Sequence, residues 1–202
     1  GAGTVSGLTP GASANVYFSD SGASAGNQVN MTMGANMALN SITVNGTSGS
    51  PVNTNPVSLT STGGYTLTLT GSGGSGITMN TGAGAVTLNP AIVLGNSQTW
   101  TNDSSNALTV NGVVSGGNAL TKAGTGEAIL SGANTYSGGT VINAGTLTSY
   151  AGSAAGAKTM FGTGSVTANA GTTTRPPRST VLFTIATSPS TVSSSFECSR
   201  SP

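Results

Sequence analysis

Residues 120–147 read LTKAGTGEAILSGANTYSGGTVINAGTL, and this stretch decides the fold. Its apolar side chains fall in short alternating runs, as in EAIL at residues 127–130, and glycine, asparagine and serine separate the runs. Alternation with a period of two predicts a strand with one buried face, and the separating residues favour tight turns because glycine and asparagine tolerate positive φ. The stretch therefore predicts short β-strands joined by tight turns.

The same pattern recurs along most of the chain. Further strand-length runs lie at residues 41–44, 65–70, 77–79, 85–88, 91–94 and 107–110. Threonine, valine, isoleucine and tyrosine favour strands, whereas each glycine inside a helix costs roughly 1 kcal/mol. An all-β chain with such short strands forms either an antiparallel sandwich or barrel, or a parallel solenoid with coils of about 20 to 30 residues.

A recurring asparagine favours the solenoid. Asparagine ends the strand pattern at Asn45, Asn80, Asn89, Asn111 and Asn143. In a solenoid these side chains stack at the corner of successive coils, while apolar residues fill a narrow interior. Alternate threonines and serines then point outward and stack in ladders, in which each neighbour contributes about 0.2–1 kcal/mol. A sandwich does not need the same corner residue repeatedly, so we expect an all-β parallel solenoid.

Residues 120–148 resemble the autotransporter-associated β-strand repeat, also called the passenger-associated transport repeat. The usual form of that repeat is close to L-T-K-x-G-x-G-x-L-x-L-S-G-x-N-T-Y-x-G-G-T-x-[VI]-x-x-G-T-L. The matching positions are Leu120, Thr121, Lys122, Gly124, Gly126, Leu130, Ser131, Gly132, Asn134, Thr135, Tyr136, Gly138, Gly139, Thr140, Gly145, Thr146 and Leu147. Glu127 departs mildly, because it stands near where the repeat more often has threonine. Segments from residue 6 onward resemble more loosely the region that precedes such repeats.

The resemblance implies a right-handed parallel β-helix from the passenger region of a secreted or surface-displayed bacterial protein. It associates the repeat with export and stalk building, and not with catalysis. We therefore expect a non-enzymatic, extracellular structural segment that acts as a stalk, a spacer or a filament subunit. An adhesin-type module that binds a glycan or a host surface is the alternative, and a carbohydrate-active enzyme is a remote one.

The composition narrows the classes of partner. The chain has 202 residues, 32 of them glycine, and only 4% are charged, against roughly 25% in ordinary domains. A net charge of +1 gives no electrostatic steering toward nucleic acid, so we expect no nucleic-acid partner. No apolar run approaches the roughly 20 residues of a membrane-spanning helix. The start at Gly1, without methionine, indicates a mature or excised fragment.

The chain divides into two regions of different composition. We assign residues 1–171 to the solenoid, with the repeat at 120–148, and residues 172–202 to a tail rich in serine, threonine and proline. The tail holds three of the five basic residues and the single cysteine, Cys198, which has no partner for an intramolecular disulfide. We interpret it as a disordered linker, as a capping or partner-binding tail, or as sequence outside the native reading frame. Residues 181–186 predict an edge strand that meets a neighbouring subunit, and copies joined end to end through solenoid ends or edge strands would form a fibre.

The inventory of catalytic and metal-binding groups is small. The chain has no histidine, and its only acids are Asp20, Asp103, Glu127 and Glu197. Asp103 and Glu127 are about one coil apart and form the single candidate carboxylate pair, but we interpret both as solvated corner residues with Lys122 as a neighbour. Residues 71–76 (GSGGSG) contain no aspartate, so they predict a turn and not a calcium or phosphate site. We expect no catalytic residue, cofactor or metal.

Three further features are candidate binding or modification sites. Trp100, Tyr65 and Tyr136 offer flat faces for stacking against sugars. Trp100 is, however, predicted to fill the core or cap a coil, and Tyr136 to take a structural position at a corner. Residues 66–70 (TLTLT) offer the spacing used to order ice, which needs repetition in register over many coils. The sequons at Asn30, Asn45 and Asn102 are relevant only in a eukaryotic secretory pathway, which the bacterial resemblance disfavours.

Overall fold

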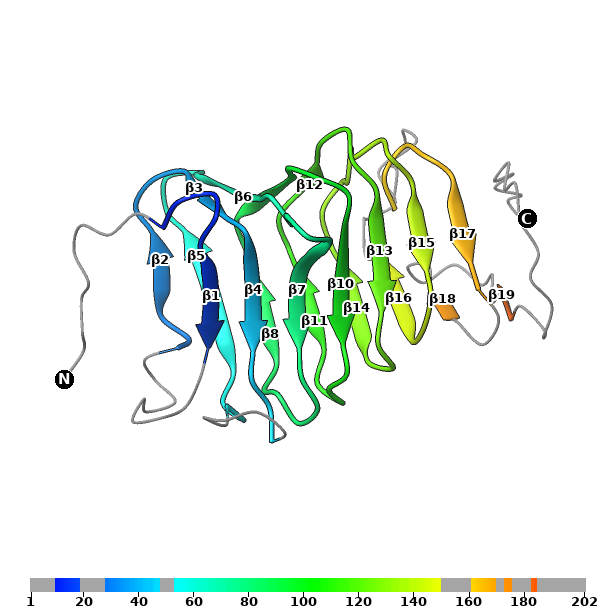
Figure 1. The fold of residues 1–202 in the computed structure, drawn as a ribbon, viewed down its shortest axis with the longest axis horizontal. Coiled ribbons are helices and arrows are strands. Elements are labelled where there is room, and N and C mark those ends of the chain that lie inside the picture. The colour runs from blue at the N-terminus through cyan, green and yellow to red at the C-terminus, as the bar shows by residue number, and fades with distance from the viewer. Residues whose placement is uncertain are drawn as a thin grey trace, which may run out of the picture.

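A computed structural model of the chain describes residues 10–18, 28–47, 53–149, 161–169, 173–175 and 183–184. The chain winds through these ranges as a succession of stacked coils, built from short strands joined by turns (Figure 1). None of the described residues is helical, so no helix within them is long and apolar enough to cross a membrane. The prediction of an all-β parallel solenoid is confirmed.

The strands form three sheets, which we call A, B and C. Sheet A runs in the order β1 (Asn15–Phe18), β4 (Ser41–Val44), β7 (Ser75–Met79), β10 (Gln98–Asn102), β13 (Leu120–Ala123), β15 (Thr140–Ile142) and β17 (Val166–Ala168). Sheet B runs in the order β2 (Met31–Met33), β5 (Val57–Ser61), β8 (Val86–Leu88), β11 (Leu108–Val110), β14 (Glu127–Leu130), β16 (Thr146–Ser149), β18 (Thr173–Arg175) and β19 (Phe183–Thr184). Sheet C runs in the order β3 (Met37–Leu39), β6 (Thr66–Leu69), β9 (Ala91–Leu94) and β12 (Val114–Ser115).

The coils differ in length along the chain. Ile42 pairs with Ile77 in the next coil, 35 residues on, whereas Lys122 pairs with Ile142, only 20 residues on. The spacing then increases again to 26 residues between Ile142 and Ala168, although β12 is the last strand of sheet C among the described residues. Later coils in this part of the chain therefore close with strands of sheets A and B alone.

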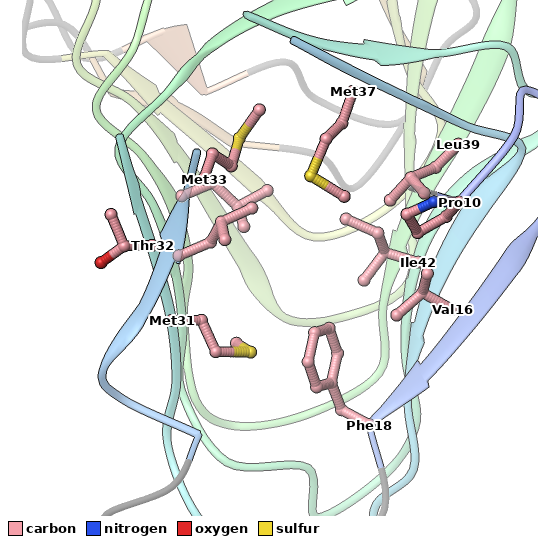
Figure 2. Close-up of a pocket in the computed structure, with 11 residues that line it drawn as sticks. Pro10, Val16, Phe18, Met31, Thr32, Met33, Met37, Leu39 and Ile42 are labelled. Atoms are coloured by element: carbon pink, nitrogen blue, oxygen red, sulfur yellow. The ribbon is translucent and has the colours of Figure 1, made fainter. Parts of the chain in front are cut away.

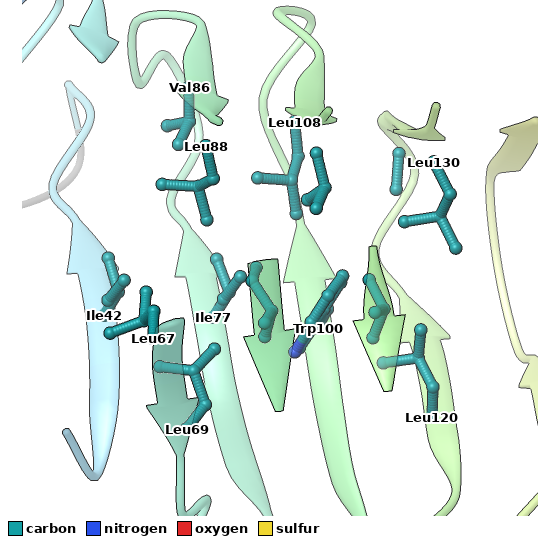
Figure 3. Packing of buried hydrophobic residues seen from close by; sticks show 14 of the residues in the cluster. Ile42, Leu67, Leu69, Ile77, Val86, Leu88, Trp100, Leu108, Leu120 and Leu130 are labelled. Atoms are coloured by element: carbon teal, nitrogen blue, oxygen red, sulfur yellow. The ribbon is translucent and has the colours of Figure 1, made fainter. Parts of the chain in front are cut away.

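The core consists of columns of side chains that occupy equivalent positions in successive coils. In sheet B, Val86 lies in register with Leu108, and both are fully buried. In sheet A, Ile42, Ile77 and Trp100 form a second column (Figure 3). Each column continues from coil to coil because alternation turns every second side chain of a strand inward. The narrow apolar interior predicted from the sequence is thus present.

Hydroxyl side chains form ladders on the outer faces. Thr43, Thr78 and Thr101 lie in register on sheet A. On sheet B the outward residue of β5 is Ser58, and Thr87 and Thr109 follow it in the next two coils. Stacking of like side chains favours neutral groups, because identical charges in register would repel. The prediction of outward threonine ladders is therefore confirmed.

The corner asparagines stack, but at two corners and not one. After sheet A, Asn80 donates from Nδ2 to Oδ1 of Asn45 at 3.2 Å. After sheet B, Asn111 donates in the same way to Asn89 at 2.7 Å. Asn143 returns to the first corner, where it accepts a bond from Asn169 at 2.7 Å. Both turns end a parallel strand, so an amide ladder suits either corner, and coils of unequal length hide which corner a given asparagine occupies.

Two short strands of the tail belong to sheet B. β18 pairs in parallel with β16, and β19 pairs with β18 in the antiparallel direction. The strand expected at residues 181–186 thus lies beside a strand of its own chain. The remaining tail residues, including Glu197 and Cys198, lie outside the described residues, as does Asp20.

Candidate functional site

The coil at residues 120–148 contains the most unusual polar side chain of the described core. In β13 the inward positions fall on Leu120 and Lys122, and Lys122 is only 1% exposed. It stands in the column of sheet A between Trp100 and Ile142. The aliphatic stem of a lysine can pack as an apolar side chain while its amine reaches a polar group. Strand alternation therefore places a cation in a column that is otherwise mostly apolar.

The Lys122 amine is held by main-chain oxygens. Its Nζ donates to the carbonyl oxygens of Ala123 at 2.6 Å, Gly124 at 2.8 Å and Ala144 at 3.3 Å. The first two carbonyls belong to its own corner and the third to the next coil, so the amine links two coils. Burial lowers the pKa of Lys122 from 10.5 to about 8, and the Asp103 carboxylate opposes that shift.

The expectation of two solvated corner residues with Lys122 as a neighbour holds for Asp103, whereas Glu127 is half-buried in β14. Asp103 is exposed at the corner after β10, as predicted, and acts on Lys122 through its charge. Lys122 itself is inside, because it lies two residues after the inward Leu120 in the same strand.

Asn102 is the last residue of β10 and directly precedes Asp103 at this corner. It is fully buried, its Nδ2 donates to the carbonyl oxygens of Asn106 at 2.9 Å and Glu127 at 2.8 Å, and its Oδ1 accepts from the Ser104 amide at 2.9 Å. The bond to Glu127 reaches the next coil. The Asn102 sequon nitrogen is thus fully engaged inside the fold, whereas Asn30 is exposed and Asn45 half-buried.

Glycines let the successive corners approach closely. Gly124 has φ +77°, and a Cβ there would lie 2.3 Å from the carbonyl oxygen of Asn102. Gly145, one coil later, has φ +69°, and its Cβ would lie 2.5 Å from the carbonyl oxygen of Gly124. Both the backbone conformation and the spacing therefore require glycine.

Asn134 replaces the strand that sheet C lacks in this coil. The Thr135 amide donates to the Val114 carbonyl at 2.8 Å, as a parallel strand would. The Val114 amide donates to Oδ1 of Asn134 at 2.9 Å, so a side-chain oxygen takes the place of a backbone carbonyl. The outer edge of β12 is thereby satisfied without another strand.

Tyr136, two residues after Asn134, belongs to the core. Its side chain is fully buried, its hydroxyl lies 2.7 Å from Oγ1 of Thr140, and that Oγ1 donates to the Phe161 carbonyl at 2.8 Å. Burial raises the pKa of Tyr136 from 10.0 to about 12, with the bond to Thr140 opposing the shift. Tyr136 thus has the predicted structural role, but its side chain belongs to the core.

The two candidate acids lie on neighbouring segments, and each has a structural contact. Glu127 accepts a hydrogen bond from Oγ1 of Thr148, in the next coil. Its backbone carbonyl accepts from Asn102, the residue before Asp103, so the two acids belong to adjacent coils at one corner. No group of three or more metal-ligating side chains occurs among the residues that the structure describes.

The other candidates are also built into the fold. Trp100 is 1% exposed and donates from Nε1 to Oε1 of Gln98 at 3.2 Å, as its predicted core position requires. Tyr65 is half-buried against the core. Thr68, in the run at residues 66–70, is in register with Ala38 and Val93, so its hydroxyl is not repeated in the adjacent coils of sheet C.

The glycine-rich run at residues 71–76 forms the predicted turn. The Gly74 amide donates to the Gly71 carbonyl at 2.8 Å, and both residues have positive φ. Gly76 already belongs to β7, where a Cβ would lie 1.7 Å from Oε1 of Gln98. The run therefore combines a turn with one position at which a Cβ would displace the Gln98 side chain of the neighbouring coil.

The roles of Asn102 and Gln98 were not predicted. Both occupy inward positions of β10, with Gln98 donating from Nε2 to the Leu69 carbonyl at 3.0 Å. The alternation about Trp100 in the sequence QTWTN was the available signal, because it places the first and last residues on the same face as the tryptophan.

Comparison with known proteins gives one match. The family model described as Passenger-associated-transport-repeat matches residues 120–148. Searches of curated proteins and of solved structures found no match. The matched segment begins with β13 and ends in β16, so it contains Lys122, Asn134 and Tyr136. The chain thus carries a passenger-associated transport repeat, and the repeat is the coil in which a buried lysine and an asparagine cap replace parts of the regular solenoid.

Proposed function

We propose that the chain is a structural solenoid segment, a stalk or spacer, of a secreted or surface-displayed bacterial protein. The observation that carries the proposal is the use of the repeat's distinctive side chains. Lys122 and Asn134 are buried and bond to main-chain groups, and Tyr136 is buried against Thr140. Because these side chains are buried and hydrogen-bonded within the solenoid, they stabilise the stacked coils and are not exposed to a substrate. This arrangement supports a structural role and not a catalytic one.

The polar groups of the core support the same proposal. Among the described residues, every buried side-chain nitrogen and oxygen has a hydrogen-bond partner. A fully satisfied polar interior stabilises one arrangement of the coils, because any shift of register would leave buried donors and acceptors without partners. A solenoid with a fixed register is therefore expected to be a stiff rod of defined length.

The axial rise per coil sets what a spacer can do. Parallel strands lie about 4.8 Å apart, so each added coil lengthens the solenoid by that amount without widening it. The implied extracellular location rests on the passenger-associated transport repeat at residues 120–148. A non-enzymatic role is part of the proposal.

The proposal is tested by lengthening the solenoid in register. Ile77, Trp100 and Lys122 occupy one column, so a second copy of residues 77–121 inserted before Lys122 adds two coils. Two inserted copies should increase the maximum dimension in small-angle X-ray scattering by about 19 Å at constant cross-section. The control carries the same inserted residues in scrambled order, which should not extend the rod. A wider particle, or equal behaviour of the two inserts, would refute the spacer role, and glycan-array binding or glycan turnover by the chain would favour the alternatives.

A further inference from the structure

Two corners of the solenoid carry a chemically labile pair of residues. Asn45-Gly46 follows a strand of sheet A and Asn111-Gly112 follows a strand of sheet B, and the sequence contains no other Asn-Gly pair. Asparagine is among the thermolabile residues of proteins. A glycine after it leaves the approach to the side-chain amide carbon unhindered, because glycine has no side chain of its own.

At the sheet B corner the stacking of coils requires both members of the pair. Asn111 is exposed, and its Nδ2 donates to Oδ1 of Asn89 in the preceding coil at 2.7 Å. A Cβ at Gly112 would overlap the carbonyl group of Pro90 in that coil. The amide ladder thus needs the asparagine and the close approach needs the glycine, so the fold itself places a labile pair at an exposed corner.

The stacked coils also hold the main chain of this pair in place. The Asn111 amide donates to the Leu88 carbonyl at 2.8 Å, and the Val113 carbonyl accepts from the Ile92 amide at 2.8 Å. Both partners belong to the preceding coil, so the chain is fixed on each side of Gly112. Cyclisation between the Gly112 nitrogen and the Asn111 side chain requires rotations that these hydrogen bonds oppose. A local opening of the corner would release them together.

We propose that Asn111-Gly112 is a site of spontaneous deamidation that is protected while the coils are stacked and is modified when the corner opens. In the open corner the Gly112 nitrogen attacks Cγ of Asn111 and forms a new C–N bond. Nδ2 leaves as ammonia, and it takes with it the proton of the Gly112 amide. Water then opens the resulting succinimide at one of its two carbonyl carbons, which gives aspartate or isoaspartate.

Either product hinders the corner from closing again. Isoaspartate adds one main-chain atom between the Asn111 amide and the Val113 carbonyl, so the bonds to Leu88 and Ile92 cannot both re-form with their present lengths. Aspartate lacks the donor that reaches Asn89, and it adds a negative charge at the corner. The modification turns a transient opening into a permanent one, whatever the role of the solenoid.

The pair at Asn45 is a comparison within the same molecule. Asn45 accepts a hydrogen bond from Asn80 at 3.2 Å, and its amide donates to the Phe18 carbonyl at 3.1 Å. The Phe18 side chain points into an apolar cavity of about 270 Å³ (Figure 2), and residues 48–52, which follow this corner, lie outside the described residues. The proposal therefore rests on Asn111.

The test measures deamidation of the full chain at each asparagine, in mildly alkaline buffer, by peptide mapping that resolves aspartate from isoaspartate. Conversion at Asn111 should be slow in the native chain and fast in urea. Asn89→Ala should speed conversion at Asn111 about 2- to 12-fold, the factor by which the loss of one hydrogen bond raises the population of the open corner, and should leave Asn45 unchanged. Asn80→Ala is the matched control and should speed conversion at Asn45 alone.

Circular dichroism of both variants shows whether they fold, and the parent chain provides an independent readout. Urea below the unfolding transition should change the Asn111 rate only slightly, because a local opening exposes little surface. Equal rates in native and urea-unfolded chain, no acceleration at Asn111 in Asn89→Ala, or equal acceleration at both asparagines would overturn the proposal. A urea dependence as steep as that of global unfolding would overturn it as well.

Discussion

Replacing Gly145 by alanine should destabilise the solenoid far more than replacing Gly64. Both residues have φ +69°, a conformation that costs a non-glycine residue about 1–2 kcal/mol. They differ in their surroundings, because a Cβ at Gly64 meets nothing within 4 Å. At Gly145 it would lie 2.5 Å and 2.6 Å from the carbonyl oxygens of Gly124 and Gly126, which belong to the preceding coil.

The paired variants isolate the coil-to-coil contact from the backbone conformation. Carbonyl oxygens cannot rotate away as a side chain can, so Gly145→Ala must push two coils apart, and overpacking of this kind costs typically about 1–3 kcal/mol. We therefore expect Gly145→Ala to lose about 1–3 kcal/mol more than Gly64→Ala in urea unfolding followed by circular dichroism. Equal losses from the two substitutions would show that the corners do not stack as described, and would refute the reasoning.

Three further predictions concern the buried polar side chains. The free energy of unfolding should rise between pH 8 and 10.5, because the folded-state pKa of Lys122 lies below its unfolded value, and should fall between pH 10 and 12, because that of Tyr136 lies above. In urea titrations Lys122→Met should abolish the rise and Tyr136→Phe the fall, and an unchanged profile in either variant would contradict the assignment. Asn134→Ala should cost about 1–3 kcal/mol and speed hydrogen exchange at the Val114 amide, whereas protection equal to the parent would exclude the cap. Asn102→Ala should lower the free energy of unfolding by about 3 kcal/mol. A loss smaller than that caused by replacing an exposed asparagine with alanine would show that Asn102 does not bridge two coils.

The strands were the most predictable feature of the structure. The runs at residues 41–44, 91–94 and 127–130 coincide with β4, β9 and β14. Alternation signals burial on one face, and here one face of each strand is buried, so the local pattern and the fold agree. The buried position of Trp100 followed from the same rule.

The polar interior was less predictable because it depends on contacts between coils. The charge of Lys122 suggests an exposed position although strand alternation places it inward, and the carbonyl oxygen of Ala144 in the next coil completes its set of hydrogen-bond acceptors. Likewise, Asn134 resembles any turn asparagine until β12 is seen to lack a further strand. Coil lengths that range from 20 to 35 residues in sheet A prevent a fixed period from revealing these partners.

The stacking of the repeat on the preceding coil can be measured directly with engineered disulfides in the Cys198→Ser background. Thr109 and Ile129 are in register on β11 and β14, about 4.8 Å apart, a separation that a disulfide spans. Thr87 and Ile129 are two coils apart, at about 9.6 Å, which is too far. Mass spectrometry should find a rapid intramolecular disulfide in the Thr109→Cys, Ile129→Cys variant and none in the Thr87→Cys, Ile129→Cys variant. Failure of the first pair, or equal closure of both, would contradict the solenoid register on which the account depends.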